Sequence, residues 1–473
     1  MYKQLAAIVG KPYVHQADEV LTTYECDFFM LMKAKPDWVV IPASTEEVAN
    51  VVRLCIKHQV PFVARGSGTG LSGGVLAVKG GVIISLVRMN RILEINTNTR
   101  TATVETGVIN GWINREARPF NLFYAPDPSS QSACTLGGNI AENAGGIHCI
   151  KYGVTADHIL ALEVVTPEGD VIWLDQSGEI NWLGLFIGSE GTFGIATQAV
   201  IQLLPIPQKT KVFLAAFSAL TDATNLVQEI MASGLNPAAL EFMDDFTVKA
   251  VNAAFDVGFP ESAQAVLLIE LDGTDVEVAI TEQRLVKLLN RHQVCELRTA
   301  EDEAERHRLW QARKGAVASY GRILPSYYLH DCVIPRGQLT TILQAIQAIG
   351  KKYNVLIGNV FHAGDGNLHP HILFDPAEEG TYERVLQAGE EILKACLAVG
   401  GVLSGEHGIG MEKSEFMPLQ FTPSELAVMQ RLKPVFDPKR LANPEKIFPM
   451  SKGCGETRIK MPHPLIQKEA MWI

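Results

Sequence analysis

The sequence predicts an α+β protein with two large parts, and three observations lead to this prediction. The chain has 473 residues, whereas a typical domain has about 150. Its glycines cluster in four segments separated by glycine-poor stretches, at 66–80, 137–153, 184–194 and 358–410. Short strands and helices alternate in the first third, and longer amphipathic helices begin near Lys211. We therefore expect domains over residues 1–207 and 208–415, followed by a C-terminal helical segment over residues 416–473.

The composition is that of an acidic globular protein. Apolar residues make up 47% of the chain and charged residues 20%, which is ordinary for a globular enzyme. There are 41 Lys and Arg against 52 Asp and Glu, for a net charge of −11, so a nucleic-acid partner is disfavoured. The 8 cysteines are scattered without a CxxC pair, which favours reduced thiols. No apolar run approaches the ~20 residues of a membrane-spanning helix, and we expect a cytoplasmic protein, either free or peripheral on the inner face of the membrane.

Local patterns place the elements of both parts. Residues 38–42 form a predicted strand, and Ser44 with Glu47 forms a capping box for a helix that follows it. Further strands are predicted at 61–64, 82–87 and 101–106. In the second part, strands at 265–271 and 327–335 alternate with predicted helices at 221–233, 276–292, 301–320, 338–353 and 381–399. This order predicts a sheet covered by helices, with the boundary between the parts near the prolines at 205 and 207.

Three glycine-rich segments in the first part predict a large cofactor. Residues 65–74 hold five glycines in ten positions, which lets successive N–H groups point into one concavity, as a diphosphate requires; a tight connection between strands is the structural alternative. Residues 126–146 and 188–194 combine glycines with Ser, Thr and Asn, so a flat ligand could approach closely. Three such segments on one framework imply a cofactor with a phosphate end and a planar end.

Together with residues 24–27, 149–153 and 437–446, these segments resemble the vanillyl-alcohol-oxidase-type FAD-binding family. The similarity is to its FAD-linked 2-hydroxy acid oxidases and dehydrogenases, which include the catalytic subunit of bacterial glycolate oxidase and D-lactate and D-2-hydroxyglutarate dehydrogenases. It extends from Tyr24 to Phe448. The resemblance implies a two-part α+β FAD-binding domain, an α+β cap domain with a helix-covered antiparallel sheet, and a C-terminal segment that returns to the FAD domain.

The resemblance also implies which residues hold the flavin. Relatives that bind FAD covalently carry a histidine in the first glycine segment where Leu71 and Ser72 stand here, so we expect non-covalent FAD. The residues implied for this role are Arg65, Gly66, Ser67, Gly68, Thr69, Gly70, Leu71, Ser72, Pro126, Asp127, Ser130, Gly137, Gly138, Asn139, Asn143, Gly145, Gly146, Gly188, Gly191, Gly194, Ile195 and Asn443.

The second part contains a cluster of histidines, in residues 362–371 and 404–410. Two imidazoles and a carboxylate with an open position are typical of a catalytic zinc or manganese site. The alternative is a polar turn in which the histidines pair with Asp365 and Asn367. The resemblance implies that His362, His369 and Glu406 are the metal ligands and that His407 is the catalytic base.

Arg313 is the remaining candidate. On the sequence alone, Arg313 and Lys314 are the solvated face of a helix. The resemblance implies instead that Arg313 grips the substrate carboxylate, for which the guanidinium fork is suited. Relatives that oxidise D-2-hydroxyglutarate carry a lysine where Leu329 stands and an asparagine where His371 stands. The absence of both groups favours a small monocarboxylic 2-hydroxy acid.

The resemblance therefore implies FAD-dependent oxidation of glycolate to glyoxylate. His407 would take the hydroxyl proton while hydride passes to flavin N5, and D-lactate is the alternative substrate. The resemblance implies that the electrons pass to a partner, with iron–sulfur and second flavin-type subunits as acceptors, or to the quinone pool. Two other classes remain open: a metal-dependent hydrolase without flavin, which leaves the glycine segments without a purpose, and a non-catalytic partner subunit, which has no need of the histidine set.

Overall fold

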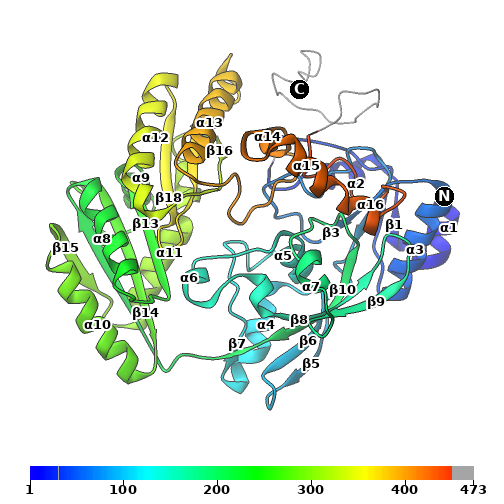
Figure 1. The fold of residues 1–473 in the computed structure, drawn as a ribbon, viewed down its shortest axis with the longest axis horizontal. Coiled ribbons are helices and arrows are strands. Elements are labelled where there is room, and N and C mark those ends of the chain that lie inside the picture. The colour runs from blue at the N-terminus through cyan, green and yellow to red at the C-terminus, as the bar shows by residue number, and fades with distance from the viewer. Residues whose placement is uncertain (30, 450–473) are drawn as a thin grey trace. The chain divides into compact units, whose positions relative to one another are not determined.

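The computed structural model describes residues 1–29 and 31–449, which divide into two compact units (Figure 1). The first unit contains Met1–Gly146, Gly153–Ile206 and the described residues from Glu406 onward; the second contains Ile147–Tyr152 and Pro207–Gly405. The second unit thus ends earlier than the expected boundary at residue 415. The part of the expected 416–473 segment beyond residue 449 lies outside the described residues.

The short stretch Ile147–Tyr152 belongs to the second unit, although it lies between two glycine segments of the first. Its side chains bind strand β14 (Ala265–Gly273). His148 Nε2 lies 3.2 Å from Glu270 Oε1, and the Tyr152 hydroxyl donates to Asp272 at 2.6 Å. Lys151 also forms an ion pair with Asp272. Sequence proximity to the first domain did not reveal these contacts.

The first sheet of the first unit has the strand order β1-β2-β4-β3, with β2, β4 and β3 parallel. Helix α3 begins after Ser44, whose Oγ accepts from Glu47 N, while the Glu47 carboxylate accepts from Ala43 N. The predicted helix is confirmed, and its apolar stripe is buried in the core of this layer. The elements are α1 (Tyr2–Val9), β1 (Val14–His15), α2 (Asp18–Thr22), β2 (Trp38–Val40), α3 (Thr45–His58), β3 (Phe62–Arg65) and β4 (Val82–Ser85).

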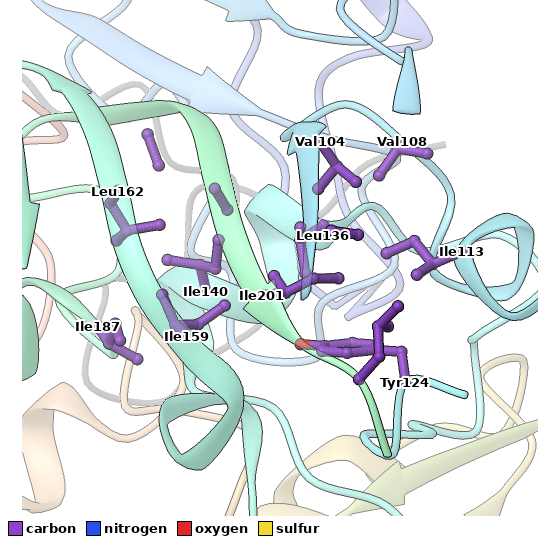
Figure 2. Packing of buried hydrophobic residues seen from close by; sticks show 14 of the residues in the cluster. Val104, Val108, Ile113, Tyr124, Leu136, Ile140, Ile159, Leu162, Ile187 and Ile201 are labelled. Atoms are coloured by element: carbon purple, nitrogen blue, oxygen red, sulfur yellow. The ribbon is translucent and has the colours of Figure 1, made fainter. Parts of the chain in front are cut away.

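The second sheet of the first unit is antiparallel, with the order β5-β6-β10-β8-β9. Its core joins strand residues such as Val104, Leu162 and Ile201 to Leu136 and Ile140 of helix α5 (Figure 2). This packing fixes the position of α5, which carries part of the second glycine segment. The elements are β5 (Ile92–Asn96), β6 (Thr101–Glu105), α4 (Asn110–Ala117), β7 (Leu122–Phe123), α5 (Leu136–Glu142), β8 (Ile159–Val165), β9 (Val171–Asp175), α7 (Trp182–Phe186), β10 (Ile195–Gln202) and β11 (Leu204–Pro205).

The C-terminal described segment returns to the first sheet of this unit. Asn443 N donates to Phe62 O at 2.8 Å, and Phe62 N donates to Leu441 O at 2.9 Å. Asp437 supports the return because its carboxylate accepts from Leu441 N and Ala442 N. The helices here are α14 (Met417–Gln420), α15 (Pro423–Gln430) and α16 (Leu432–Phe436).

The second unit is built on a large antiparallel sheet with the order β15-β12-β14-β13-β18-β19-β17, in which β18 also pairs with β20 and β20 with β16. The predicted strand over 327–335 is observed as two short strands, because His330 and Asp331 lie outside the ladder in the interior. The strands are β12 (Lys209–Phe217), β13 (Ala239–Asp244), β14, β15 (Val294–Thr299), β16 (Ser326–Leu329), β17 (Cys332–Val333), β18 (Leu356–His362), β19 (Asn367–Leu368) and β20 (Pro370–Phe374).

Helices cover this sheet, as predicted. Helices α9 and α11 share one core with Val212, Leu214 and Ala216 of β12. Alternate residues of that strand, such as Phe213 and Phe217, are also fully buried and face the other side of the sheet. The helices are α6 (Cys149–Tyr152), α8 (Leu220–Ala232), α9 (Asp245–Ala254), α10 (Asp275–Leu289), α11 (Glu303–Tyr320), α12 (Leu339–Tyr353) and α13 (Thr381–Ala398). Among the described residues, no helix is both long and apolar enough to cross a membrane.

Candidate functional site

The glycines of the first unit fall into two groups according to what faces them. A Cβ on Gly66 would lie 2.1 Å from Thr135 Oγ1, and one on Gly146 would lie 2.4 Å from Asp127 O. Gly137 and Gly194 are similarly crowded by Thr106 and Val165. In these positions glycine is required by the protein's own packing.

In the second group a Cβ would make only ordinary van der Waals contacts. A Cβ on Gly70 would meet only Asp27 Oδ2 at 3.8 Å, and one on Gly191 only Asn443 Nδ2 at 3.8 Å. Gly138 and Gly188 have their nearest neighbours at 3.5 and 3.4 Å. These glycines come from all three glycine segments, and the space beside them suits a ligand that approaches the backbone closely. The residues present therefore fit the cofactor that the sequence predicts.

Several residues implied for flavin binding use their side chains inside the protein. Arg65, at the end of β3, donates to Cys26 O at 2.9 Å, and its guanidinium lies beneath Gly68. Asn139 accepts from Asn110 Nδ2 at 3.1 Å, and Ile195 is buried in the core of the first sheet. These three side chains shape the loops.

Asn443 and Asn143 connect segments that are distant in sequence. Asn443 Nδ2 donates to Gly74 O at 2.9 Å and to Glu190 O at 2.6 Å, which ties the first glycine segment to the third. Asn143, at φ 53°, accepts from Ala156 N at 2.9 Å. The structure thus brings the three glycine segments and the C-terminal return together within one unit.

Behind these loops lies a set of buried charged groups that the sequence analysis did not identify. Burial raises the pKa of Asp27 to about 7, although its carboxylate accepts from Phe29 N and Gly73 N. Burial lowers the pKa of Lys446 to about 7. Burial and the neighbouring Glu190 hold the pKa of Glu142 well above its usual range. All three lie in segments that carry the family resemblance, within 24–27, 126–146 and 437–446, but the sequence did not show that their side chains are buried together.

In the second unit, His362 is held by a carboxylate from the neighbouring strand. Glu241 of β13 is the register partner of His362 at the end of β18, and its Oε1 lies 2.8 Å from His362 Nδ1. The His369 ring lies 5.2 Å away and nearly perpendicular to that of His362. A carboxylate on one ring nitrogen orients a histidine so that the other nitrogen can bind a metal. The donor set therefore fits a divalent ion.

Arg313 of α11 binds the same carboxylate. It forms an ion pair with Glu241 and is only 6% exposed, which contradicts the solvated-face interpretation, whereas Lys314 is exposed. Burial alone would raise the pKa of Glu241, but Arg313 and His362 outweigh it and lower that pKa below its ordinary value. Glu241 was missed because it lies 121 residues from His362, within a strand sequence that carries no motif.

Asp331 binds the last residues of the second unit. Its Oδ1 lies 3.9 Å from His369 Nδ1, and its Oδ2 accepts from Ser404 Oγ and Gly405 N at 2.7 and 2.9 Å. Gly405 is the last residue of this unit, and Glu406 and His407 follow it directly in the chain.

The two positions that bear on substrate size are neighbours. Leu329 of β16 and His371 of β20 are register partners. The His371 ring lies 5.3 Å from the rings of both Tyr320 and Tyr327, and its Nδ1 lies 2.7 Å from His369 O. These contacts of His371 are thus with tyrosine rings and a backbone carbonyl.

Comparisons with known proteins identify the family of the chain. A family described as "FAD binding domain" matches residues 36–175, and one described as "FAD linked oxidases, C-terminal domain" matches residues 206–447. Glycolate oxidase subunit GlcD of Escherichia coli (strain K12) is 43% identical over 95% of this chain and 91% of its own length. The same subunit of Bacillus subtilis is 37% identical over 94% and 96%, and a D-lactate dehydrogenase of Anaerostipes hadrus is 32% identical over 88% and 90%.

Solved structures agree on the fold. A p-cresol methylhydroxylase is 16% identical, with a TM-score of 0.79 over 94% of this chain and 95% of that one. An alkyldihydroxyacetonephosphate synthase is 20% identical, with a TM-score of 0.75 over 94% and 84%. The α+β fold predicted from the glycine segments and the helix-covered sheet is confirmed.

Proposed function

The chain belongs to the FAD-linked oxidases, and from this premise we propose that it oxidises a small 2-hydroxy acid, glycolate first and D-lactate second. The names of its relatives support both substrates, since they are glycolate oxidase subunits and a D-lactate dehydrogenase. The observation that carries the proposal is the buried Glu241, which holds an arginine and a histidine at one place.

Arg313 is the proposed anchor for the substrate carboxylate. Glu241 binds the guanidinium from one side. The planar guanidinium has further N–H donors, which can bind the carboxylate of the substrate. Because Arg313 is buried, this pairing would be screened less by solvent than a surface ion pair. Leu329 and His371 support a substrate with one carboxylate.

His407 is the proposed base that takes the proton of the 2-hydroxyl group. Bound FAD supplies the acceptor for the hydride that leaves C2. His362, His369 and Glu406 would hold a divalent ion, zinc or manganese, that acts as a Lewis acid toward the substrate oxygens. The remaining task of the protein is to orient the acid and receive its proton.

The electrons then need an acceptor. Because the glycolate oxidase relatives are named as subunits, we propose that iron–sulfur and second flavin-type partner subunits receive them. The proposal places this chemistry in the cytoplasm. A metal hydrolase without flavin is set aside, since the chain belongs to the FAD-linked oxidases.

The test is an anaerobic visible spectrum of the purified protein, titrated separately with glycolate, D-lactate, L-lactate and D-2-hydroxyglutarate. We expect the flavin band to bleach with glycolate or D-lactate and not with D-2-hydroxyglutarate. In His407→Ala the flavin should remain bound but unreduced, whereas His58→Ala, an exposed histidine of α3, should behave as the wild type. A flavoprotein that none of the acids reduces would contradict the proposal.

A further inference from the structure

Glu190 has an unusual place in the third glycine segment. It lies at φ 52°, between Gly188 and Gly191, in a backbone region that residues with side chains rarely adopt. Such a conformation is retained only where the surroundings hold it. Here Glu190 N donates to Ala141 O at 2.8 Å, and the side chain is 6% exposed. The segment therefore directs this carboxylate into the interior.

The carboxylate of Glu190 binds the turn that follows His407. Oε1 accepts from Ile409 N at 2.8 Å, and Oε2 accepts from Gly410 N at 2.7 Å. Both oxygens are thus used on successive backbone N–H groups, an arrangement that only an ionised carboxylate satisfies fully. All of these residues belong to the first unit.

The same turn is confined from two further sides. Gly408 lies at φ 85°, and a Cβ there would come within 2.3 Å of Glu142 Oε2 and 3.1 Å of Glu190 Oε1. A Cβ on Gly410, at φ 51°, would lie 2.1 Å from Ser72 O. Neither glycine has room for a side chain, so the backbone next to His407 has one tightly determined path.

Burial and the groups around Glu190 have opposite effects on its pKa. Burial raises the pKa of Glu190, and the two N–H donors, Lys446 and Lys413 offset that rise only in part. Lys446 is itself fixed, since its Nζ donates to Leu76 O at 2.7 Å. Glu142 faces the same turn and would add a second charge only against the repulsion of Glu190.

We infer that Glu190 is a positioning residue for proton transfer: by binding Ile409 N and Gly410 N it fixes the backbone that carries His407. The inference rests on the proposed function, in which His407 takes the substrate proton. Glu190→Gln removes one of these two hydrogen bonds with little change in side-chain volume. The amide has only one oxygen to accept, so its NH₂ group must face the other backbone N–H donor, which it cannot bind.

The test compares Glu190→Gln with Glu105→Gln, a matched change at a buried carboxylate of β6 that accepts from Arg91 N. We expect Glu190→Gln to keep its FAD and its KM for glycolate while the rate of anaerobic flavin reduction falls about 10- to 100-fold. Hydrogen exchange at Ile409 and Gly410 should become faster. Glu190→Asp, which keeps the charge, should recover part of the rate, and Glu105→Gln should match the wild type in rate and exchange.

Each other outcome has a defined meaning. Unchanged reduction and exchange in Glu190→Gln would overturn the inference while leaving the proposed function intact. Loss of FAD would make Glu190 a cofactor-binding residue, and unfolding of both Glu190 variants would make it a purely structural one; either result overturns the inference. If the wild type is reduced by none of the acids, the proposed function fails, and the inference fails with it.

Discussion

The functional regions of the two units differ in whether backbone or side chains form them. In the first unit the glycine segments offer backbone, and a Cβ on Gly70, Gly138, Gly188 or Gly191 would make only ordinary van der Waals contacts with the protein. In the second unit the site is made of side chains from separate elements, with Glu241 between Arg313 and His362. A backbone site can be recognised within a few consecutive residues, whereas a side-chain site depends on strand register. The comparison also predicts that removing Glu241 costs more stability than placing a methyl group on a glycine of the first unit.

The largest effect is expected at Glu241. Glu241→Ala leaves a buried arginine without its carboxylate, and removing one partner of a buried ion pair costs about 3–5 kcal/mol of unfolding free energy. Flavin reduction should be lost as well, because Arg313 and His362 both lose their fixed orientation. Urea denaturation and anaerobic reduction measure the two effects. Glu270→Ala is the control on the neighbouring strand. Among the described residues, the hydrogen-bond partners of the Glu270 carboxylate are His148 and Trp310, and neither is an arginine. An equal loss of stability and of flavin reduction in Glu270→Ala would contradict this account.

A smaller effect is expected where a glycine is required by packing. Gly146→Ala places a Cβ 2.4 Å from Asp127 O at φ 151°. Overpacking of this kind costs about 1–3 kcal/mol, so the apoprotein should unfold at lower denaturant concentration. Wild-type stability of this variant would show that the second glycine segment is not held as described.

Gly70→Ala separates packing from ligand binding. A methyl group there meets only Asp27 Oδ2 at 3.8 Å, so the apoprotein should keep its stability within about 0.5 kcal/mol. FAD affinity should nevertheless fall, by about tenfold if ~1.4 kcal/mol of binding energy is lost. Fluorescence titration of the apoprotein with FAD measures this. Gly337→Ala, with no heavy atom within 4 Å of its Cβ, should leave both quantities unchanged, and an unaltered FAD affinity in Gly70→Ala would refute the assignment of the space beside Gly70 to the cofactor.

The smallest effects are expected at helix caps, one in each unit. Ser44 caps α3 and Thr274 caps α10, each by accepting from a backbone N–H three residues later. Replacing either by alanine should cost about 1 kcal/mol, with no change in the flavin spectrum or its reduction. A drop in reduction rate for either variant would mean that cap strength is coupled to the site.

The same contrast explains how much the sequence could predict. The glycine segments, the helix after Ser44 and the helix-covered sheet follow from local spacing, and the fold built on them is confirmed. The break at His330 and Asp331 could not be predicted. The side-chain pattern of residues 327–335 is compatible with one continuous strand and does not show that these two polar residues leave the ladder.

The missed residues share one property. Glu241 and Glu190 are single acidic residues whose partners lie 121 residues away in one case and 219 and 220 in the other. Only the strand register in the second unit and the return of the C-terminal segment in the first bring these partners together. Arg313 was assigned by resemblance alone, because its partner Glu241 is also distant in the sequence. The pattern of its helix does not reveal that Arg313 is buried and ion-paired with Glu241.

The central claim is that hydride leaves C2 of a small 2-hydroxy acid for the flavin of this protein. The most direct measurement is the rate of flavin reduction in rapid anaerobic mixing, with saturating glycolate carrying either hydrogen or deuterium at C2. The account predicts that both substrates bleach the flavin and that the deuterated one does so more slowly. Equal rates, or a flavin that neither substrate reduces, would contradict it.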